Sequence, residues 1–465
     1  MHVTIAHRLI LKDVPEVLIA EIRKRLTLLN PKWVDNNKMG RSNYKVEQHL
    51  KFYTVRKDGT VLVPRGWGNH LARLCQVHDE QVTYEDLRRE LDPVDFSFQG
   101  ELKPFQETAV QTMCSKYFGT LSAPTGAGKT VCGLALIARR RQPALVVVHT
   151  KELMNQWVEQ IEHFLGIPAR EVGRIGGGKM SVGDRITVAT VQTLYKCAEE
   201  VAPNIGHIVV DECHRAPSRT FTEAVTKFDC KYSLGLSATP WRRDRLSQLI
   251  FWFLGDMLHQ VDKEDLLDSG HILRPEIFFR PTEFRTTLDP SEEYPRMLAE
   301  LVDDPGRNQR IVRDVAEEVR SGTGVALVLS DRKGHCHHLR DLLAREYGVE
   351  AELLTGELSI PEREAVVRKL KTDQARVLVA TGQLIGEGFD CDAFTSLFFA
   401  TPVRFSGRVL QYLGRVLRPG QDTRRPRVYD YVDVHVGPLE AGAKARKRTY
   451  EETYSISRED VHEWE

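Results

Sequence analysis

A stretch of eight residues has the composition of a loop that binds phosphate. It reads Ala123-Pro124-Thr125-Gly126-Ala127-Gly128-Lys129-Thr130, follows a short apolar stretch and precedes an apolar-periodic one that begins near Val131. Glycines let successive backbone N–H groups turn towards one anion, and the dipole of a following helix favours the same anion. Lys129 would supply a charge for the β- and γ-phosphates, and Thr130 a hydroxyl for Mg²⁺. The stretch predicts a nucleotide site, although Ala123 stands where such a loop usually has its first glycine.

Two adjacent carboxylates follow a second apolar stretch. Asp211 and Glu212 come directly after residues 207–210, which we expect to form a strand. An open α/β sheet binds its ligands at the carboxyl ends of its strands. One carboxylate at that edge can hold Mg²⁺ through water, and its neighbour can orient or deprotonate an attacking water. With a phosphate loop upstream in the same sheet, the pair predicts hydrolysis of a nucleoside triphosphate.

The elements that would position these residues alternate regularly from residue 102 onwards. We expect helices at 102–117, from 131, and at 152–165, with strands at 120–122, 144–149, 186–190, 207–210 and 232–236. Beyond a stretch expected to be irregular, 241–306, we expect strands at 325–329, 349–354, 377–380, 396–400 and 427–434 and helices at 334–347, 361–371 and 406–417. Near-continuous apolar strands alternating with helices predict α/β units whose parallel sheets are covered on both faces.

The first 100 residues follow a different pattern and are expected to form a separate mixed domain. Within the first 74 residues, 14 Lys and Arg stand against 6 Asp and Glu, whereas 75–100 reverse the sign. The basic residues are interleaved with Trp33, Tyr44, Tyr53 and Trp67. Cations for phosphates and rings for bases suit a nucleic-acid surface. A solvated basic face over an aromatic core fits the same pattern equally well.

Composition limits the classes of protein to which the chain can belong. With 465 residues, 41% of them hydrophobic and 28% charged, the chain is expected to be a globular protein of two to four domains. The eight cysteines contain no C-x-x-C pair, which argues against a zinc site or a disulfide framework. His335-Cys336-His337-His338 are expected on a plain helix surface. No signal peptide or long apolar span is evident, so we expect a cytoplasmic protein with no membrane partner.

Ordered motifs give the chain a clear resemblance to the superfamily 2 helicases of the DExH type. Asp211-Glu212-Cys213-His214 looks like the Walker B box, and Gln411 to Arg418 matches the sixth box, Q-x-x-G-R-x-x-R, without a gap. The other similar stretches are Phe105-Gln106, His149 to Leu153, Thr190 to Leu194, Ser237-Ala238-Thr239, Ala380 to Gln383 and Gly386 to Asp390. The family commonly has alanine at the position of Ala123, so that departure is no objection.

The resemblance implies two RecA-like parallel-sheet domains in tandem, 101–262 and 263–436, after a smaller N-terminal α+β domain, 1–100, and before a charged tail, 437–465. It implies ATP and Mg²⁺ as cofactors. The catalytic residues carried over are Lys129, Asp211, Glu212, Gln411, Arg415 and Arg418. Those expected to bind the nucleotide are Phe105, Gln106, Ala123, Pro124, Thr125, Gly126, Ala127, Gly128, Lys129, Thr130, Gly388 and Asp390, with Thr130 and Asp211 towards the metal. The residues expected to couple ATP hydrolysis to the nucleic acid are His214, Ser237, Ala238 and Thr239. Those expected to contact the nucleic acid are Thr150, Lys151, Gln192, Thr193 and Thr381.

Details within the motifs resemble the XPB branch, whose members act on duplex DNA, and related phage enzymes that remodel branched DNA. Arg242-Arg243-Asp244 departs from that branch's Arg-Glu-Asp, which puts any strand-separating role of the triplet in doubt. The expected function is an ATP-dependent DNA helicase or translocase, with a nuclease or a repair or defence protein as a further partner. Alternatives are the duplex motor of a restriction complex, an RNA-remodelling enzyme and an ATP-switched clamp. Gly176-Gly177-Gly178-Lys179 is either a backbone loop for phosphate or a surface turn.

Overall fold

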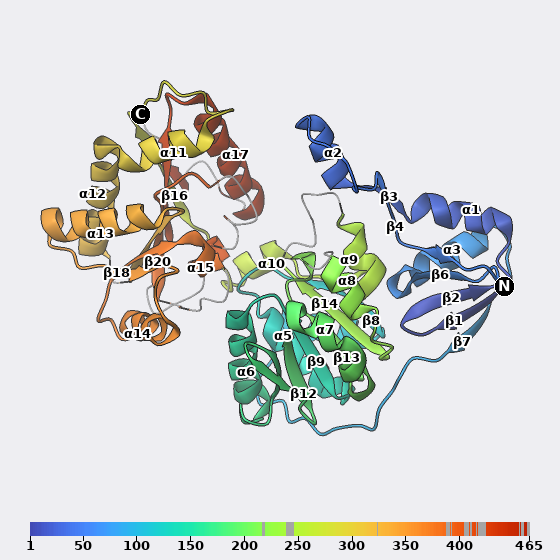
Figure 1. Ribbon diagram of the computed structural model, residues 1–465. Coiled ribbons are helices and arrows are strands. Elements are labelled where there is room, and N and C mark those ends of the chain that lie inside the picture. The colour runs from blue at the N-terminus through green and yellow to red at the C-terminus, as the bar shows by residue number, and fades with distance from the viewer. Residues whose placement is uncertain are drawn as a thin grey trace. The chain divides into compact units, whose positions relative to one another are not determined.

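The computed structural model describes residues 1–215, 219–238, 246–322, 324–386, 391, 393–403, 409, 412–414, 416, 425–454, 456 and 460–462. The chain forms two compact units, one of residues 1–123 with 128–261 and the other of residues 262–465 with 124–127 (Figure 1). The expected helix 406–417 lies largely outside the described residues.

The N-terminal part of the first unit is built on a five-stranded sheet. Its strand order is β5-β6-β2-β1-β7, and β7 runs parallel to β1. The elements are β1 (His2–Ile5), β2 (Arg8–Lys12), α1 (Glu16–Arg25), β3 (Thr27–Leu29), α2 (Pro31–Lys38), β4 (His49–Lys51), β5 (Thr54–Val55), β6 (Val61–Pro64), α3 (Gly68–Val77) and β7 (Thr83–Asp86). Strands β3 and β4 pair with each other outside this sheet and carry α2 (Figure 1). The acid-rich stretch around β7 therefore belongs to the same domain as the basic stretches before it.

The rest of the first unit contains an eight-stranded sheet. Its order is β11-β10-β12-β9-β13-β14-β8-β15, and every pairing is parallel except that of β10 with β11. The strands are β8 (Phe118–Ser122), β9 (Ala144–Val148), β10 (Gly173–Gly176), β11 (Lys179–Ser181), β12 (Ile186–Thr190), β13 (His207–Val210), β14 (Tyr232–Ser237) and β15 (Met257–Gln260). The helices are α4 (Pro104–Cys114), α5 (Lys129–Arg140), α6 (Lys151–Leu165), α7 (Val191–Val201), α8 (Arg219–Val225) and α9 (Gln248–Leu254). The expected parallel α/β sheet is confirmed.

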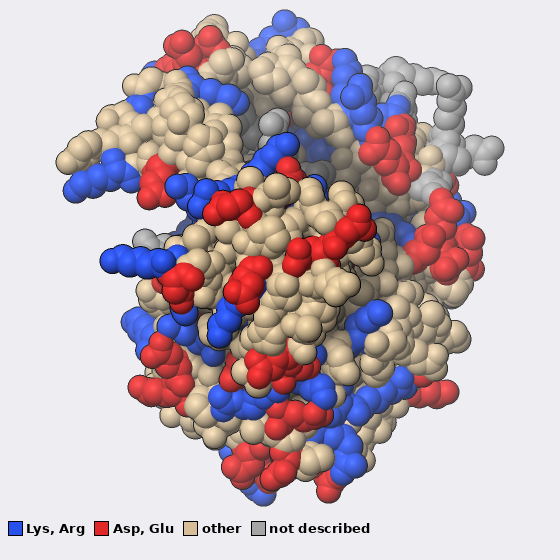
Figure 2. All heavy atoms as spheres, turned by 90° about the vertical axis from the view of Figure 1, so that its right-hand side faces the viewer, with Lys and Arg blue, Asp and Glu red and all other residues tan. Residues whose placement is uncertain are grey.

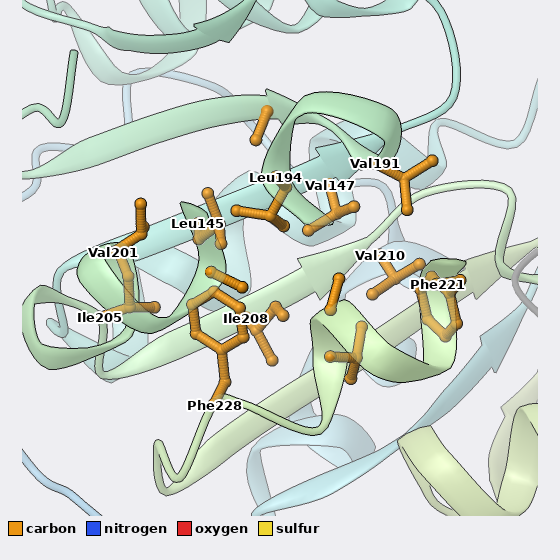
Figure 3. Close-up of a cluster of buried hydrophobic side chains, with 14 of the residues drawn as sticks. Leu145, Val147, Val191, Leu194, Val201, Ile205, Ile208, Val210, Phe221 and Phe228 are labelled. Atoms are coloured by element: carbon orange, nitrogen blue, oxygen red, sulfur yellow. The ribbon is translucent and has the colours of Figure 1, made fainter. Parts of the chain in front are cut away.

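One face of this sheet is closed by a buried apolar cluster. Leu145 and Val147 of β9 and Ile208 and Val210 of β13 point towards Leu194 of α7 and other side chains of α7 and α8 (Figure 3). Alternate residues of a strand face one side, so the same strands present their other residues to the opposite helices. Close packing of this kind fixes the positions of the strand ends and therefore also those of the residues that directly follow them.

The N-terminal domain and the eight-stranded sheet share a hydrophobic core. Leu249 and Trp252 of α9 belong to the same buried cluster as Trp67 and the apolar side chains of α1 and α3. Arg65 is buried and donates to the carbonyl oxygen of Cys230 at 2.7 Å. A Cβ on Gly66 would lie 2.2 Å from the carbonyl oxygen of Phe251, so only glycine allows this approach. The two domains are joined by packing as well as by the chain.

The second unit contains a seven-stranded sheet of order β18-β19-β17-β20-β21-β16-β22, whose pairings are parallel. Its strands are β16 (Glu276–Thr282), β17 (Val325–Ser330), β18 (Glu352–Leu354), β19 (Val377–Thr381), β20 (Phe394–Phe399), β21 (Arg427–Asp433) and β22 (Val461–His462). Its helices are α10 (Lys263–Asp268), α11 (Tyr294–Asp303), α12 (Pro305–Ser321), α13 (Lys333–Tyr347), α14 (Ile360–Lys371), α15 (Gly382–Gly386) and α17 (Gly437–Tyr454). The expectation of an irregular segment at 241–306 was wrong, because α9 to α11, β15 and β16 lie there. Of these elements, α11 has an apolar pattern at helical spacing that could have been recognised, with Met297, Leu298, Leu301 and Val302 buried.

The segment expected to be a charged tail, 437–465, contains α17, which is docked on the second unit's sheet. Arg446 of this helix is buried and donates to both carboxylate oxygens of Asp430, at 2.6 and 2.7 Å. The hydroxyl of Tyr450 donates to the same carboxylate at 2.8 Å. Helical spacing places Leu439, Ala443, Arg446 and Tyr450 on one face, so a charged residue lies in the middle of the buried stripe. The buried arginine interrupts the apolar pattern, so the sequence of this segment is that of a charged tail.

The histidine-rich stretch also differs from its expected place on a helix surface. His335 and Cys336 of α13 are buried, and only the next two histidines are accessible. His335 is hydrogen-bonded through Nδ1 to Ser330 Oγ at 3.0 Å and through Nε2 to Asn308 Oδ1 at 2.9 Å. Across the described residues, no three His, Cys, Asp or Glu side chains gather as a metal site. No helix in that part of the chain is long and apolar enough to cross a membrane.

Candidate functional site

The phosphate loop connects β8 to α5, as the sequence predicts. Gly126 and Gly128 have φ of +91° and +77°, a region that only glycine enters without strain. A Cβ on Gly128 would also lie 2.4 Å from Nε2 of Gln106. Lys129 begins α5, and its Nζ donates to the carbonyl oxygen of Ala123 at 3.2 Å. The lysine therefore folds back over the start of its own loop, where phosphate oxygens can replace the carbonyl.

Gln106 supports the loop from α4. Its side chain is 6% exposed, and its Oε1 accepts a hydrogen bond from the backbone N–H of Lys103 at 3.0 Å. Because the same amide fills the space next to Gly128, Gln106 is positioned against the loop itself. Phe105 lies beside it and is half-buried. The structure thus places Gln106, with Phe105 next to it in the chain, at the predicted phosphate loop.

Asp211 is the first residue after β13 and is held by two hydrogen bonds. Its Oδ2 accepts from the indole Nε1 of Trp157 at 2.8 Å, and its Oδ1 accepts from the backbone N–H of Glu212 at 2.9 Å. Burial, followed by the negative charge of Glu212, raises the pKa of the Asp211 carboxyl to about 6, against the opposing effect of the Trp157 hydrogen bond. A nearby cation would favour the charged form, so the site suits a metal ligand.

Glu212, His214 and Ser237 are brought together by the fold. The Nδ1 atom of His214 lies 3.2 Å from Oε2 of Glu212 and 3.0 Å from Oγ of Ser237. Ser237 is the last residue of β14, the strand between β13 and β8 in the sheet. The predicted catalytic carboxylate and two predicted coupling residues therefore form one contact chain, with Ala238 immediately after it.

The predicted nucleic-acid residues of the first unit gather at the other half of the same sheet. Thr150 caps α6, its Oγ1 accepting from the backbone N–H of Leu153 at 3.2 Å. Gln192 donates to the carbonyl oxygen of His149 at 3.3 Å, and Thr193 accepts from the hydroxyl of Thr190 at 3.1 Å. These bonds connect the ends of β9 and β12.

The glycine stretch 176–178 forms the turn of the hairpin β10–β11 beside these residues. All three glycines have positive φ, at +141°, +58° and +84°. A Cβ on Gly176 would lie 2.5 Å from Oγ1 of Thr190, and one on Gly177 would lie 3.0 Å from Cε of Lys151. The hairpin therefore places the buried Gly176 next to Thr190 and the exposed Gly177 next to Lys151.

Other predicted residues lie apart or outside the described chain. Thr381 ends β19 in the second unit and is half-buried. Six of the predicted residues lie outside the described part of the chain: Thr239, Gly388, Asp390, Gln411, Arg415 and Arg418. The triplet Arg242-Arg243-Asp244 lies outside it as well.

Trp157 is the site residue that the sequence reasoning missed. It lies on α6, is 2% exposed, and its ring also borders Gly133 of α5, where a Cβ would lie 3.2 Å from it. A buried indole N–H usually has an acceptor. A tryptophan on the apolar face of an amphipathic helix indicates that its N–H group has a buried acceptor. The sequence does not identify that acceptor.

The chain is similar in sequence to known helicases and to a restriction-enzyme subunit. A family model described as "Type III restriction enzyme, res subunit" matches residues 99–242, and one described as "Helicase conserved C-terminal domain" matches residues 309–420. The DNA 3'-5' translocase XPB2 of Sulfurisphaera tokodaii is 27% identical over 68% of this chain and 79% of its own length. The DNA 3'-5' helicase XPB of Kineococcus radiotolerans is 25% identical over 86% of this chain and 72% of its own. The chain belongs to the superfamily 2 helicases, in their XPB-like branch.

The fold of this superfamily 2 helicase is also found in solved structures. S. cerevisiae Dbp5 bound to RNA and ADP BeF3 superposes with a TM-score of 0.56 at 13% identity, covering 77% of this chain and 89% of that one. At that identity the likeness concerns the fold alone. It confirms the α/β architecture with parallel-sheet domains that the motifs predict.

Proposed function

We propose that this helicase couples ATP hydrolysis to the unwinding or remodelling of duplex or branched DNA in repair, recombination or replication. The observation that carries the proposal is the arrangement of three neighbouring parallel strands. Asp211 and Glu212 follow β13, Ser237 ends β14, and the phosphate loop follows β8. Because these strands run the same way, a phosphate-binding group and a carboxylate base lie at one edge of one sheet.

Each side chain at this edge has a distinct chemical role. Lys129 binds the β- and γ-phosphates, since its Nζ already reaches the start of the loop. Thr130 and Asp211 would hold Mg²⁺, which supplies positive charge against the phosphates when bound. Glu212 accepts the proton of the attacking water. His214, in contact with both Glu212 and Ser237, relays the state of the nucleotide to β14.

The other half of the sheet is proposed to grip the DNA backbone. Thr150, Lys151, Gln192 and Thr193 supply hydroxyl, amide and ammonium groups there, and the N-terminus of α6 adds backbone donors. The N–H groups of the turn at 176–178 join them, and Thr381 makes the corresponding contact from the second unit. The proposed roles of Gln411, Arg415 and Arg418 are to bind and stabilise the γ-phosphate as hydrolysis proceeds.

A second candidate is a duplex translocase that moves along DNA without separating its strands. The match of residues 99–242 to the restriction-enzyme family supports it. It uses the same ATP chemistry and differs in what the motion accomplishes.

Steady-state ATP hydrolysis, measured alone and with single-stranded, duplex, forked and four-way DNA and with matched RNA, tests the proposal. We expect stimulation by DNA in excess of that by RNA. Strand separation of a fork then identifies a helicase, whereas displacement of a triplex-forming strand without separation identifies the translocase. Hydrolysis that no nucleic acid stimulates would contradict both and favour a clamp switched by ATP.

A further inference from the structure

Residues 27–51 of the first unit form an arm in which no residue is buried. It consists of the paired strands β3 and β4 with α2 between them, and it stands away from the five-stranded sheet in Figure 1. Leu28 and Leu50 at its base pack against the core of the N-terminal domain. None of the eight residues of α2 is buried. The arm is anchored at one end and surrounded by solvent at the other.

Polar contacts rather than burial hold the arm in shape. Asn30 caps α2, accepting from the backbone N–H of Lys32 at 3.0 Å, and donates to the carbonyl oxygen of Glu47 at 2.7 Å. Asn43 donates to Asn37 Oδ1 at 2.6 Å and to the carbonyl oxygen of Trp33 at 3.3 Å. A segment that gains little from burial yet keeps a defined shape is suited to presenting its side chains to a ligand.

The arm holds the whole positive surplus of the N-terminal domain. Residues 1–100 contain 16 Lys and Arg against 13 Asp and Glu, and the arm contributes five of the former and two of the latter. The other 75 residues of the domain are therefore neutral, with 11 of each sign. Figure 2, which faces this side of the molecule, shows Lys and Arg interspersed with Asp and Glu over its surface.

The cations of the arm are not neutralised within the described structure. The five are Lys32, Lys38, Arg41, Lys45 and Lys51. None lies within ion-pair distance of a carboxylate among the described residues, whereas lysines elsewhere in the same unit, such as Lys227 and Lys231, are paired. Cations that the fold leaves unpaired on a protrusion are complementary to a polyanion.

An exposed aromatic ring accompanies these cations. Tyr44 is 81% exposed, and Nζ of Lys45 lies 5.3 Å from the centre of its ring. By contrast, Trp67 is 2% exposed in the domain core, so the sequence-based suggestion that it stacks on a base is wrong. A ring beside cations offers stacking to a base and charge to the adjoining phosphates.

We propose that the arm is a DNA-binding site outside the two RecA-like domains, with its cations on backbone phosphates and Tyr44 on an unpaired base at a branch. The proposal rests on the proposed function, which supplies DNA as the polyanion. A protein partner would need a matching acidic surface and would leave the dependence of DNA affinity on salt unchanged.

The cations are tested by removing three of them, Lys38→Ala, Arg41→Ala and Lys45→Ala together. The matched control removes three exposed cations of the same domain outside the arm, Arg23→Ala, Lys24→Ala and Arg73→Ala. Affinity for labelled four-way and blunt duplex DNA is measured by anisotropy between about 50 and about 300 mM salt. We expect the arm variant to bind at least about tenfold more weakly and to lose up to about 2.7 from the slope of log affinity against log salt, at ~0.9 per duplex phosphate released. The control should keep the wild-type slope.

The ring is tested by Tyr44→Ala against Tyr44→Phe. We expect the alanine variant to bind a fork with unpaired bases roughly tenfold more weakly and to bind blunt duplex almost as tightly as the wild type. The phenylalanine variant should bind the fork with the wild-type affinity. ATP hydrolysis without DNA should stay at the wild-type rate, because the arm contains no residue of the ATP site.

An arm variant that matches its control on every DNA, while the wild type binds DNA and is stimulated by it, overturns the arm proposal alone. A wild-type chain that binds no DNA overturns the proposed function with it.

Discussion

At the scale of single residues, Glu212 has an unusual backbone conformation that bears on the role of its side chain. Its φ is +47°, a region that costs a residue with a Cβ roughly 1–3 kcal/mol. The turn places the carboxylate beside His214 rather than along the direction of β13. Such strain at the end of a buried strand is typical of a residue whose orientation is required for chemistry.

Replacing this carboxylate should separate binding from turnover. Glu212→Gln keeps the size and backbone of the residue and removes the base, so ATP binding should persist while turnover falls on the order of 10²–10⁴-fold. Lys129→Ala should weaken ATP binding as well. Both are measured by equilibrium binding of a fluorescent ATP analogue and by steady-state hydrolysis, with the exposed Glu159→Gln on α6 as the control. Near-normal turnover in Glu212→Gln would refute the assignment.

Trp157 should act by orienting Asp211. Trp157→Phe preserves most of the ring packing but removes the 2.8 Å hydrogen bond to the carboxylate. We expect apparent affinity for the metal to fall about tenfold, as for other groups that orient metal ligands. Binding of Mn²⁺ with a non-hydrolysable ATP analogue, followed by electron paramagnetic resonance, measures this directly. Trp67→Phe, an equally buried tryptophan in the same unit, should lower stability without changing metal affinity. If both variants bind the metal with equal affinity, Trp157 contributes to packing and does not orient Asp211.

At the scale of elements, His335 makes the packing of α12, α13 and β17 sensitive to acid. Burial, with the nearby Arg307 cation, lowers the pKa of His335 to about 3. Below pH 6.5 the unfolded chain protonates this histidine while the folded chain does not, so stability falls as the pH falls from 6.5 towards 3. Between pH 7 and pH 5 the contribution is about 2 kcal/mol.

Substitution should isolate that contribution. His335→Gln removes the titrating group, so the free energy of unfolding of the second unit should fall less between pH 7 and pH 5 than in the wild type. Pulse proteolysis across a urea gradient at each pH measures it. His337→Gln, a half-exposed neighbour on the same helix, should retain the wild-type dependence. If all three proteins show the same pH dependence, His335 titrates normally in the folded chain.

At the scale of the whole molecule, we expect the shared core to make the N-terminal domain and the first RecA-like sheet unfold together. Trp252 of α9 lies in that core at 4% exposure. Trp252→Ala should cost on the order of 3–5 kcal/mol, the usual range for such a truncation. Hydrogen exchange should then quicken in β6 and β8 alike, whereas Tyr44→Ala on the arm should change neither. Faster exchange confined to one of the two strands would mean that the domains fold independently.

This packing also changes how the N-terminal domain can be studied. Deletion of residues 1–100 would expose Leu249 and Trp252, so a loss of activity would not distinguish a missing DNA contact from a damaged motor. Point variants on the arm avoid that ambiguity because they leave the shared core intact.

The sequence was sufficient to predict the α/β alternation, which the structure confirms, and a nucleotide site, which stays a prediction. The phosphate loop, the carboxylate pair and the strands before them are contiguous stretches, and their geometry follows from local backbone preferences and from the direction of parallel strands. For the same reason, the positions of β8, β9, β12 and β13 agree with the expected strands to within about two residues.

The sequence does not predict which distant segments contact one another, and the fold supplies this information. Trp157 reaches Asp211 across 54 residues, and Arg65 reaches Cys230 across 165. The pairing of β7 with β1 holds the acidic stretch against the basic stretches of the N-terminal domain, so that its positive surplus remains on the arm. The docking of α17 on Asp430 turned a charged tail into part of a core. Each depends on a contact between residues far apart in the chain, and neither periodicity nor composition specifies the partner in such a contact.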